Sequence, residues 1–231
     1  KEIRSAIKAY RKNLSAHAEY QLESAVGFSD VLTISPLFGL GASGNELNQV
    51  IEDLLLQVQE KLVICTPYFN FPRTLRSKLA RLLEQGKRVE IIVGDKVAND
   101  FYIPPEQPFK MAGALPYLYE SNLRRFCEKF DAYIKNGHLT VRLWKDGDNT
   151  YHLKGIWVDN QYILLTGNNL NPRAWRLDAE NGLLIHDPKQ ELLSQAEKEL
   201  SHIRQHTKVL QDYSELEELT QYPEPVQKLL K

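Results

Sequence analysis

Cysteine is scarce in this chain, and long apolar runs are absent. Cys65 and Cys127 are the only cysteines among 231 residues, too few for a disulfide framework or a cysteine-based zinc site. No apolar run approaches the roughly 20 residues that span a bilayer, and the first residues, Lys1 to Lys12, are basic rather than a secretory signal. These absences favour a reducing cytosol and limit any membrane contact to the bilayer surface.

An excess of charge of either sign is also missing. The chain has 29 Lys and Arg against 30 Asp and Glu, a formal net charge of -1. Without a global basic field, specific nucleic-acid binding is not expected, and any affinity for anions must be local. The hydrophobic content of 42% is enough for a substantial core.

The chain begins with apolar residues at helical spacing, with Lys and Arg between them. We expect residues 1–18 to form a connector helix, packed on its own domain, and residues 19–231 to form one lobe. A basic helix lying on a membrane surface is the alternative. Because the chain opens on Lys rather than Met, we also expect that a segment upstream has been left out.

Helical and strand patterns alternate through the rest of the chain. They predict strands at 31–35, 62–66, 89–93, 139–144, 152–158, 162–165 and 183–186, and helices at 46–61, 74–85, 117–136, 191–210, 214–220 and 223–231. Strands separated by helices predict an α/β fold, with a mixed but largely parallel sheet flanked by helices on both faces. The C-terminal helices occupy roughly the last fifth of the lobe, from about residue 188.

Residues 94–116 interrupt this alternation with several prolines and glycines and with exposed-looking aromatic residues. Loops of this length are commonly lids or binding segments. Phe101 and Tyr102 are therefore candidate contacts for a lipid-like substrate. Filling of the core by these aromatic side chains is an equally good interpretation.

One segment carries a chemical pattern: His152 and Lys154 are followed, four residues after the lysine, by Asp159. In an extended segment His152 and Lys154 point to the same side. Imidazole can attack phosphorus or transfer a proton near neutral pH, and an ammonium group can hold a phosphate oxygen. We predict a phosphodiester-binding half-site that needs neither metal nor cofactor. Asp159 should shape a tight turn or orient a neighbour.

Further polar residues follow the pattern. Asn169 could donate to a second phosphate oxygen, and Glu180 could accept from the far nitrogen of the histidine and fix its tautomer. Asn168, Asn171 and Arg173 are candidate substrate contacts, although this stretch could also be only a loop with a helix cap.

A second, imperfect pattern occurs near the C-terminus. His206, Lys208 and Asp212 have three residues between the last two positions instead of four, and they lie in a polar run that reads as helix. We therefore assign no function to them.

The residues from His152 onward resemble the phospholipase D superfamily, whose half-site is written HxKxxxxD, followed by GSxN and later a Glu. Around it, Thr66-Pro67-Tyr68-Phe69, Gly94-Asp95-Lys96 and residues 99–104, 113–120 and 152–187 are similar to the bacterial phosphatidylserine synthase branch. Residues 166–169 read TGNN where GSxN is usual, so a hydroxyl contact there is in doubt while Asn169 remains credible.

The resemblance implies a two-lobed enzyme at the inner face of the cytoplasmic membrane, with one histidine from each lobe in a shared cleft. It implies transfer of the phosphatidyl group of CDP-diacylglycerol to L-serine, with release of CMP. By this likeness the chain is the C-terminal lobe, His152 is the acid/base partner, and the nucleophile lies in an upstream lobe of the same polypeptide. A cardiolipin synthase, a lipase or a nuclease of the same superfamily, or an inert lipid-surface module, are the alternatives.

Overall fold

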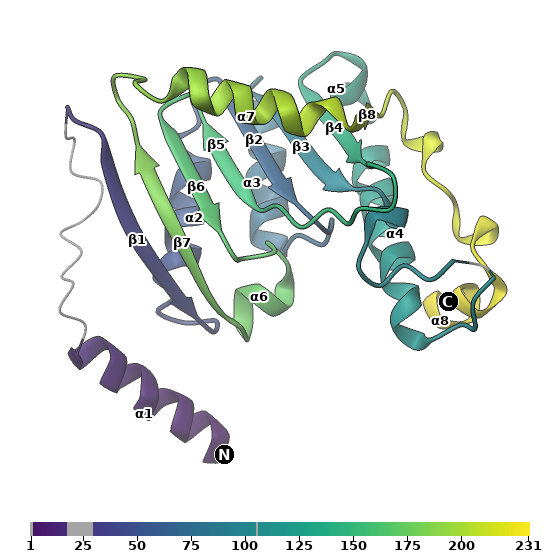
Figure 1. Cartoon of the computed structure of the whole chain (residues 1–231), viewed down its shortest axis with the longest axis horizontal. Coiled ribbons are helices and arrows are strands. Elements are labelled where there is room, and N and C mark those ends of the chain that lie inside the picture. The colour runs from purple at the N-terminus through teal and green to yellow at the C-terminus, as the bar shows by residue number, and fades with distance from the viewer. Residues whose placement is uncertain (1, 18–29, 105) are drawn as a thin grey trace.

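The computed structural model describes residues 2–17, 30–104 and 106–231. Eight strands of this part form one sheet, in the order β1-β7-β6-β5-β2-β3-β4-β8 (Figure 1). The strands are β1 (Thr33–Leu40), β2 (Lys61–Thr66), β3 (Arg88–Gly94), β4 (Leu139–Trp144), β5 (Gly155–Val158), β6 (Tyr162–Thr166), β7 (Ala179–His186) and β8 (Thr207–Val209). The α/β class and the single mixed sheet match the prediction.

The prediction of a largely parallel sheet is wrong. Only the β2–β3 and β3–β4 pairs are parallel, and the remaining five pairs are antiparallel. The parallel strands are joined by helical crossovers. β5 and β6 are joined by a tight turn, which allows antiparallel pairing alone, and β6 and β7 pair antiparallel across a longer connection that contains a short helix.

Helices cover both faces of the sheet (Figure 1). On one face, α2 (Glu46–Gln57) and α3 (Arg73–Glu84) bury leucines and isoleucines against β2, β3 and β5 in the main core cluster. On the other face, α7 (Leu193–Gln205) places Leu200 and Ile203 against Trp157 and its neighbours. On this second face the sheet is covered by α7. The strands β7 and β1 and part of β6 extend beyond that helix (Figure 1).

Four exposed apolar side chains lie on this uncovered part of the sheet. Ile34 and Phe38 alternate along β1, and Leu183 on β7 pairs with Leu165 on β6. We call Ile34, Phe38, Leu165 and Leu183 the open sheet face. Contiguous exposed apolar surface of this kind commonly marks an interaction site.

Two segments lie around the β8 end of the sheet. The first holds α4 (Leu115–Lys129) and α5 (Asp131–Lys135), and the second, at the C-terminus, holds two short turns, η3 (Tyr213–Glu215) and η4 (Leu219–Gln221), and α8 (Glu224–Leu230). The helix predicted over 191–210 ends at Gln205, because the next residues form β8 and pair with Arg142, Leu143 and Trp144 of β4. The helix predicted over 214–220 is replaced by the two turns.

Residues Glu2–His17 form α1, as the periodicity predicts. Its described side chains, at positions 3–10, are all exposed, so they do not pack on the domain as expected. The predicted boundary between residues 18 and 19 lies outside the described residues. No helix in the part of the chain that the structure describes is long and apolar enough to cross a bilayer.

Candidate active site

His152 and Lys154 lie in an extended segment that leads into β5, which begins at Gly155 rather than at His152 as predicted. The backbone N–H of Tyr151 donates to the carbonyl of Ala98, 2.9 Å away, and anchors this segment to the loop after β3. Lys154 Nζ lies 2.8 Å from His152 Nδ1 and donates to the His152 carbonyl at 3.0 Å. The two side chains therefore share one side of the segment, as the spacing predicts.

This contact assigns the tautomer of His152 in the unliganded site. An ammonium group can only donate hydrogen bonds, so Nδ1 must accept and the proton of the neutral ring lies on Nε2. The imidazole is 54% exposed. A substrate can therefore reach Nε2 directly.

Asp100 and Tyr68 face the other edge of the imidazole, and the sequence reasoning missed both. Asp100 Oδ2 lies 3.4 Å from His152 Nε2 and accepts a hydrogen bond of 2.7 Å from the Tyr68 hydroxyl. The Tyr68 ring stacks on Tyr119 at 5.1 Å and meets the imidazole edge-on. Both residues follow the carboxyl ends of parallel strands β2 and β3, a usual place for functional groups in such sheets, and this was the available signal.

Glu180 lies beside Lys154 rather than at a ring nitrogen of His152. Among the described residues, the partners of those nitrogens are Lys154 and Asp100, so the predicted contact from Glu180 to the imidazole is absent in this structure. Burial and Asp178 raise the pKa of Glu180, against the opposing effects of Lys154 and Arg173. Burial lowers the pKa of Lys154, although Glu180 and Asp100 counteract it.

Asn169 closes the site from the loop after β6. Its carbonyl accepts a hydrogen bond of 2.8 Å from the Thr66 hydroxyl, which fixes the loop to the end of β2. The side-chain oxygen of Asn169 is enclosed and has no hydrogen-bond partner within the described residues. The orphaned atom is an acceptor, so it marks a place where a ligand or water could donate a hydrogen bond.

Three residues predicted to bind substrate have structural partners instead. Asn168 is fully buried, and its side-chain oxygen accepts from the Leu170 N–H at 2.8 Å. Asn171 caps the short helix α6 (Pro172–Arg176), as the alternative interpretation held. Arg173 is paired with Asp178 at 3.2 Å, and its side chain is 78% exposed. It also lies close enough to Glu180 to lower the pKa of that carboxyl group.

Asp159 lies at the opposite end of β5 from His152. Its carboxylate accepts the backbone N–H groups of Gln59, Glu60 and Lys61, at 2.6, 2.9 and 2.7 Å. Asp159 and Asn160 both have positive φ values, 49° and 59°, in the turn between β5 and β6. The predicted tight turn is confirmed, and the carboxylate is occupied by the backbone far from the imidazole.

The two loop aromatics differ. Phe101 is 41% exposed, whereas Tyr102 packs against the small cluster of Ala114, Tyr117, Tyr222 and Val226. The core-filling interpretation therefore holds for Tyr102, and Phe101 stays a candidate contact for a lipid-like substrate. Within the described residues, no cluster of histidine, cysteine and carboxylate side chains could hold a metal ion.

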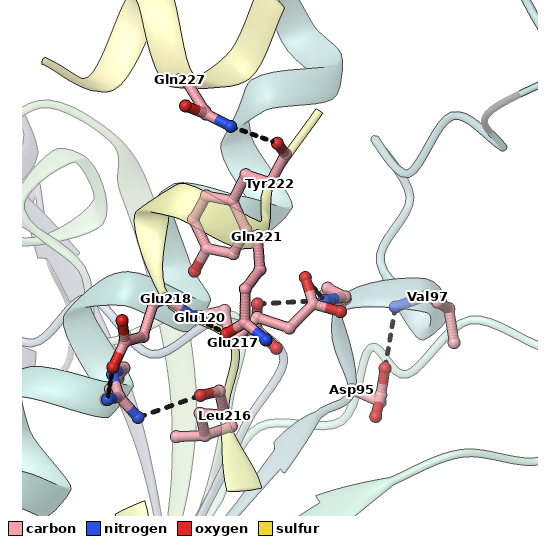
Figure 2. A network of polar contacts seen from close by, with 11 residues as sticks. Asp95, Val97, Glu120, Leu216, Glu217, Glu218, Gln221, Tyr222 and Gln227 are labelled. Carbon is pink, nitrogen blue, oxygen red and sulfur yellow. Dashed lines mark hydrogen bonds and ion pairs between the residues drawn. The ribbon is translucent and has the colours of Figure 1, made fainter. Parts of the chain in front are cut away.

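A polar network holds the base of the loop that carries Asp100. The short turn η1 (Lys96–Ala98) is capped by Asp95, whose carboxylate accepts from the Val97 N–H (Figure 2). Lys96 Nζ pairs with Glu217 at 2.6 Å and with Glu120 at 3.1 Å. Burial alone would lower the pKa of Lys96, but these two pairs outweigh it and raise the pKa. The C-terminal segment is thus coupled to the site through one loop.

Residues 51–204 match the protein family described as cardiolipin synthase, PLD-like domain. The chain belongs to this family. The resemblance to the phospholipase D superfamily is therefore confirmed, and the residues described above lie within or beside the matched segment.

Two relatives and one solved structure show which members of the family are similar to this chain. The chain is 80% identical over its whole length to the CDP-diacylglycerol–serine O-phosphatidyltransferase of Haemophilus influenzae and 54% identical to that of Escherichia coli. The crystal structure of phosphatidylserine synthase from Haemophilus influenzae superposes with a TM-score of 0.92, covering 99% of this chain and 51% of that one. This PLD-like domain thus spans about half the length of the curated relatives it matches, 51% and 50%.

Proposed function

We propose that this PLD-like domain supplies the acid/base half-site of a phosphatidyltransferase that moves the phosphatidyl group of CDP-diacylglycerol to L-serine and releases CMP. The observation that carries the proposal is the pairing of His152 Nδ1 with Lys154 Nζ at 2.8 Å, open to solvent. It occurs in a chain 80% identical to an enzyme named for this reaction. The proposal needs no cofactor.

In the first half-reaction, a histidine of a second, upstream lobe attacks the phosphorus of CDP-diacylglycerol. A phosphorus–nitrogen bond forms, the bond to the CMP oxygen breaks, and protonated His152 gives its proton to that oxygen. In the second half, serine Oγ attacks phosphorus, its proton passes to His152, and the electron pair of the broken bond returns to the first histidine. The cycle leaves His152 protonated again, ready for the next substrate.

The other site residues hold charge in this scheme. When His152 is protonated on both nitrogens, Nδ1 can no longer accept a hydrogen bond from Lys154. The ammonium group of Lys154 then turns to a nonbridging phosphate oxygen. Asn169 donates to another oxygen. Glu180 keeps the partly buried Lys154 charged, since its carboxylate raises the pKa that burial lowers. Exposed Arg173 reaches the diphosphate after leaving Asp178.

The open sheet face is our candidate contact for the upstream lobe. Its four apolar side chains lie on β1, β7 and β6. β6 ends at Thr166, shortly before Asn169, and β7 begins at Ala179, next to Glu180. A lobe covering this face would bury the apolar surface and bring its histidine to the same edge of the sheet. In the longer protein, Phe38→Asp should lower the midpoint of thermal unfolding and reduce turnover, whereas Leu56→Asp, at an exposed position of α2 on the other side of the sheet, should change neither.

A basic groove between α3 and α4 supports peripheral binding at the inner face of the cytoplasmic membrane. It has a volume of about 460 Å³ and contains five exposed cations, Arg73, Arg76, Arg81, Arg125 and Lys129. None of the five is paired with a carboxylate of the described residues. In a chain of net charge -1 such a local excess would attract anionic lipid headgroups.

Membrane binding can be tested on vesicles with and without anionic lipid. Replacing Arg76 and Arg81 by Gln should reduce sedimentation with anionic vesicles at least several-fold and weaken its salt dependence. Lys228→Gln, which removes an exposed cation paired with Glu224, is the matched control. Phe101→Ser tests the loop in the same assay, and unchanged binding would remove that residue from the contact.

The reaction itself is tested in the longer protein with vesicles of CDP-diacylglycerol and labelled serine. His152→Ala should reduce formation of phosphatidylserine and CMP by about 10²–10⁴-fold. His202→Ala, on the exposed side of α7, should have no effect. Full turnover by His152→Ala, or CMP release without labelled lipid in the unaltered protein, would contradict the proposal.

A further inference from the structure

Asp100 is held against the imidazole by two independent anchors. The Ala98 carbonyl accepts from the Tyr151 N–H at 2.9 Å, next to His152, and the base of the same loop is fixed by the Lys96 network (Figure 2). The Tyr68 hydroxyl then fixes Asp100 Oδ2 at 2.7 Å. The carboxylate is therefore placed beside Nε2 by the fold and not by a flexible side chain alone.

One oxygen of this carboxylate remains free. Oδ2 contacts Tyr68 and His152, whereas Oδ1 has no hydrogen-bond partner among the residues that the structure describes. The side chain of Asp100 is 38% exposed, on the same open side as the imidazole. An acceptor molecule approaching Nε2 would meet this oxygen first.

The charges around the imidazole are unusual for a site that binds only a phosphodiester. Among the described residues, Lys154 is the cation in direct contact with the ring. Two carboxylates, Asp100 and Glu180, act electrostatically on Lys154 and raise its pKa against the effect of burial. A phosphodiester is repelled by carboxylates, so the carboxylate of Asp100 beside the reacting nitrogen favours a ligand that carries positive charge. Glu180 acts on Lys154 and does not contact the ring, which leaves Asp100 as the carboxylate that such a ligand would meet.

We propose that Asp100 binds the ammonium group of the amino-alcohol acceptor and thereby selects serine over acceptors that lack an amino group. This inference rests on the proposed function and assigns the acceptor subsite of the same site. In serine the hydroxyl and the amino group are on adjacent carbons. Once His152 has given its Nε2 proton to the CMP oxygen, a hydroxyl donating to Nε2 brings the ammonium within reach of Asp100 Oδ1.

Asp100 acts in the second half-reaction only. The serine Oγ–H bond breaks as its proton moves to His152 Nε2, the Oγ–phosphorus bond forms, and the phosphorus–nitrogen bond returns its electrons to the histidine of the other lobe. The ammonium keeps all its protons and serves as a handle. Tyr68 remains a neutral donor throughout, because burial and the neighbouring Asp100 raise the pKa of its hydroxyl.

The test compares acceptors in the longer protein. Unaltered enzyme is given labelled CDP-diacylglycerol with L-serine, with 3-hydroxypropanoate, which is serine without its amino group, or with water alone. We expect kcat/KM for serine to exceed that for 3-hydroxypropanoate at least ten-fold. In Asp100→Asn the ratio of serine transfer to hydrolysis should fall at least ten-fold, since a charge-assisted hydrogen bond is lost.

Two further variants separate binding from positioning. Asp100→Glu keeps the charge and should retain more of the serine preference than Asp100→Asn, and Asp148→Asn, an exposed loop residue, should leave both rates unchanged. Equal loss of transfer and hydrolysis in Asp100→Asn would mean that Asp100 only orients His152, and would overturn the inference. So would equal use of the two acceptors by the unaltered enzyme, a measurement that needs no variant. Absence of any lipid product would instead count against the proposed function.

Discussion

Replacement of Asp159 should weaken the fold and leave the chemistry intact. In its carboxylate, Oδ2 accepts the Gln59 N–H and Oδ1 accepts those of Glu60 and Lys61. Two of the three bonds are exposed and one is partly buried, so we take about 0.5–1 kcal/mol for each. Asp159→Ala also removes the short polar side chain with which aspartate tolerates a φ of 49°, which costs about 1 kcal/mol more. The expected loss is about 2.5–4 kcal/mol.

Asp159→Asn separates these contributions. Asparagine tolerates the left-handed conformation, and its single carbonyl oxygen can still accept from Glu60 and Lys61, while its NH₂ faces the Gln59 donor. We expect a loss of about 1–2 kcal/mol. Urea unfolding followed by tryptophan fluorescence measures both variants, because Trp157 is buried two residues away.

The refuting result is an activity loss without a stability loss. At a temperature well below the unfolding midpoint, both Asp159 variants should keep phosphatidyltransfer in the longer protein within about three-fold of the unaltered enzyme, below 1 kcal/mol in activation free energy. If Asp159→Asn unfolds like the unaltered chain and yet loses activity by a hundred-fold, the carboxylate has a direct catalytic role and our assignment to the backbone is wrong. Asp148→Asn is the control for charge alone.

Three further predictions concern stability. Burial would raise the pKa of Glu90, but hydrogen bonds from Arg142 and Arg204 outweigh burial and lower it, so the stability from this group is present above its ordinary pKa of 4.5 and is lost as pH falls through the folded value. Acid unfolding of Glu90→Gln should therefore be less steep in that window, and the variant should lose about 2–4 kcal/mol at neutral pH. A methyl group at Gly155 would lie 2.6 Å from a ring carbon of Trp157, so Gly155→Ala should cost about 1–3 kcal/mol by urea unfolding. Lys96→Met leaves Glu217 unpaired, and limited proteolysis should then cut the C-terminal segment faster than in the unaltered chain.

The secondary structure was largely predictable, because hydrophobic periodicity is a local property. The strand predicted over 139–144 has the bounds of β4, and the helix predicted over 74–85 differs from α3 by one residue at each end. Strand direction was not predictable in the same way. Strand direction depends on which strands become neighbours in the sheet. β5 lies between β6 and β2, although β2 is far from β5 in the sequence.

The site was predictable only where its residues are close in sequence. A spacing of two places His152 and Lys154 side by side in any extended segment. Tyr68 and Asp100 reach the imidazole because β2 and β3 pair in parallel beside β5, which no local pattern encodes. The sequence also could not distinguish Asn169, whose side-chain oxygen has no partner among the described residues, from buried Asn168, because both occur in the same polar loop.

The open sheet face has a practical consequence for handling this domain. Because β1 is an outermost strand with exposed Ile34 and Phe38, it offers unpaired backbone groups and apolar side chains to any second molecule. Produced alone at high concentration, the domain should aggregate by strand-to-strand association. Charged substitutions at these two positions, or coexpression with the remaining half of the longer protein, should keep it in solution.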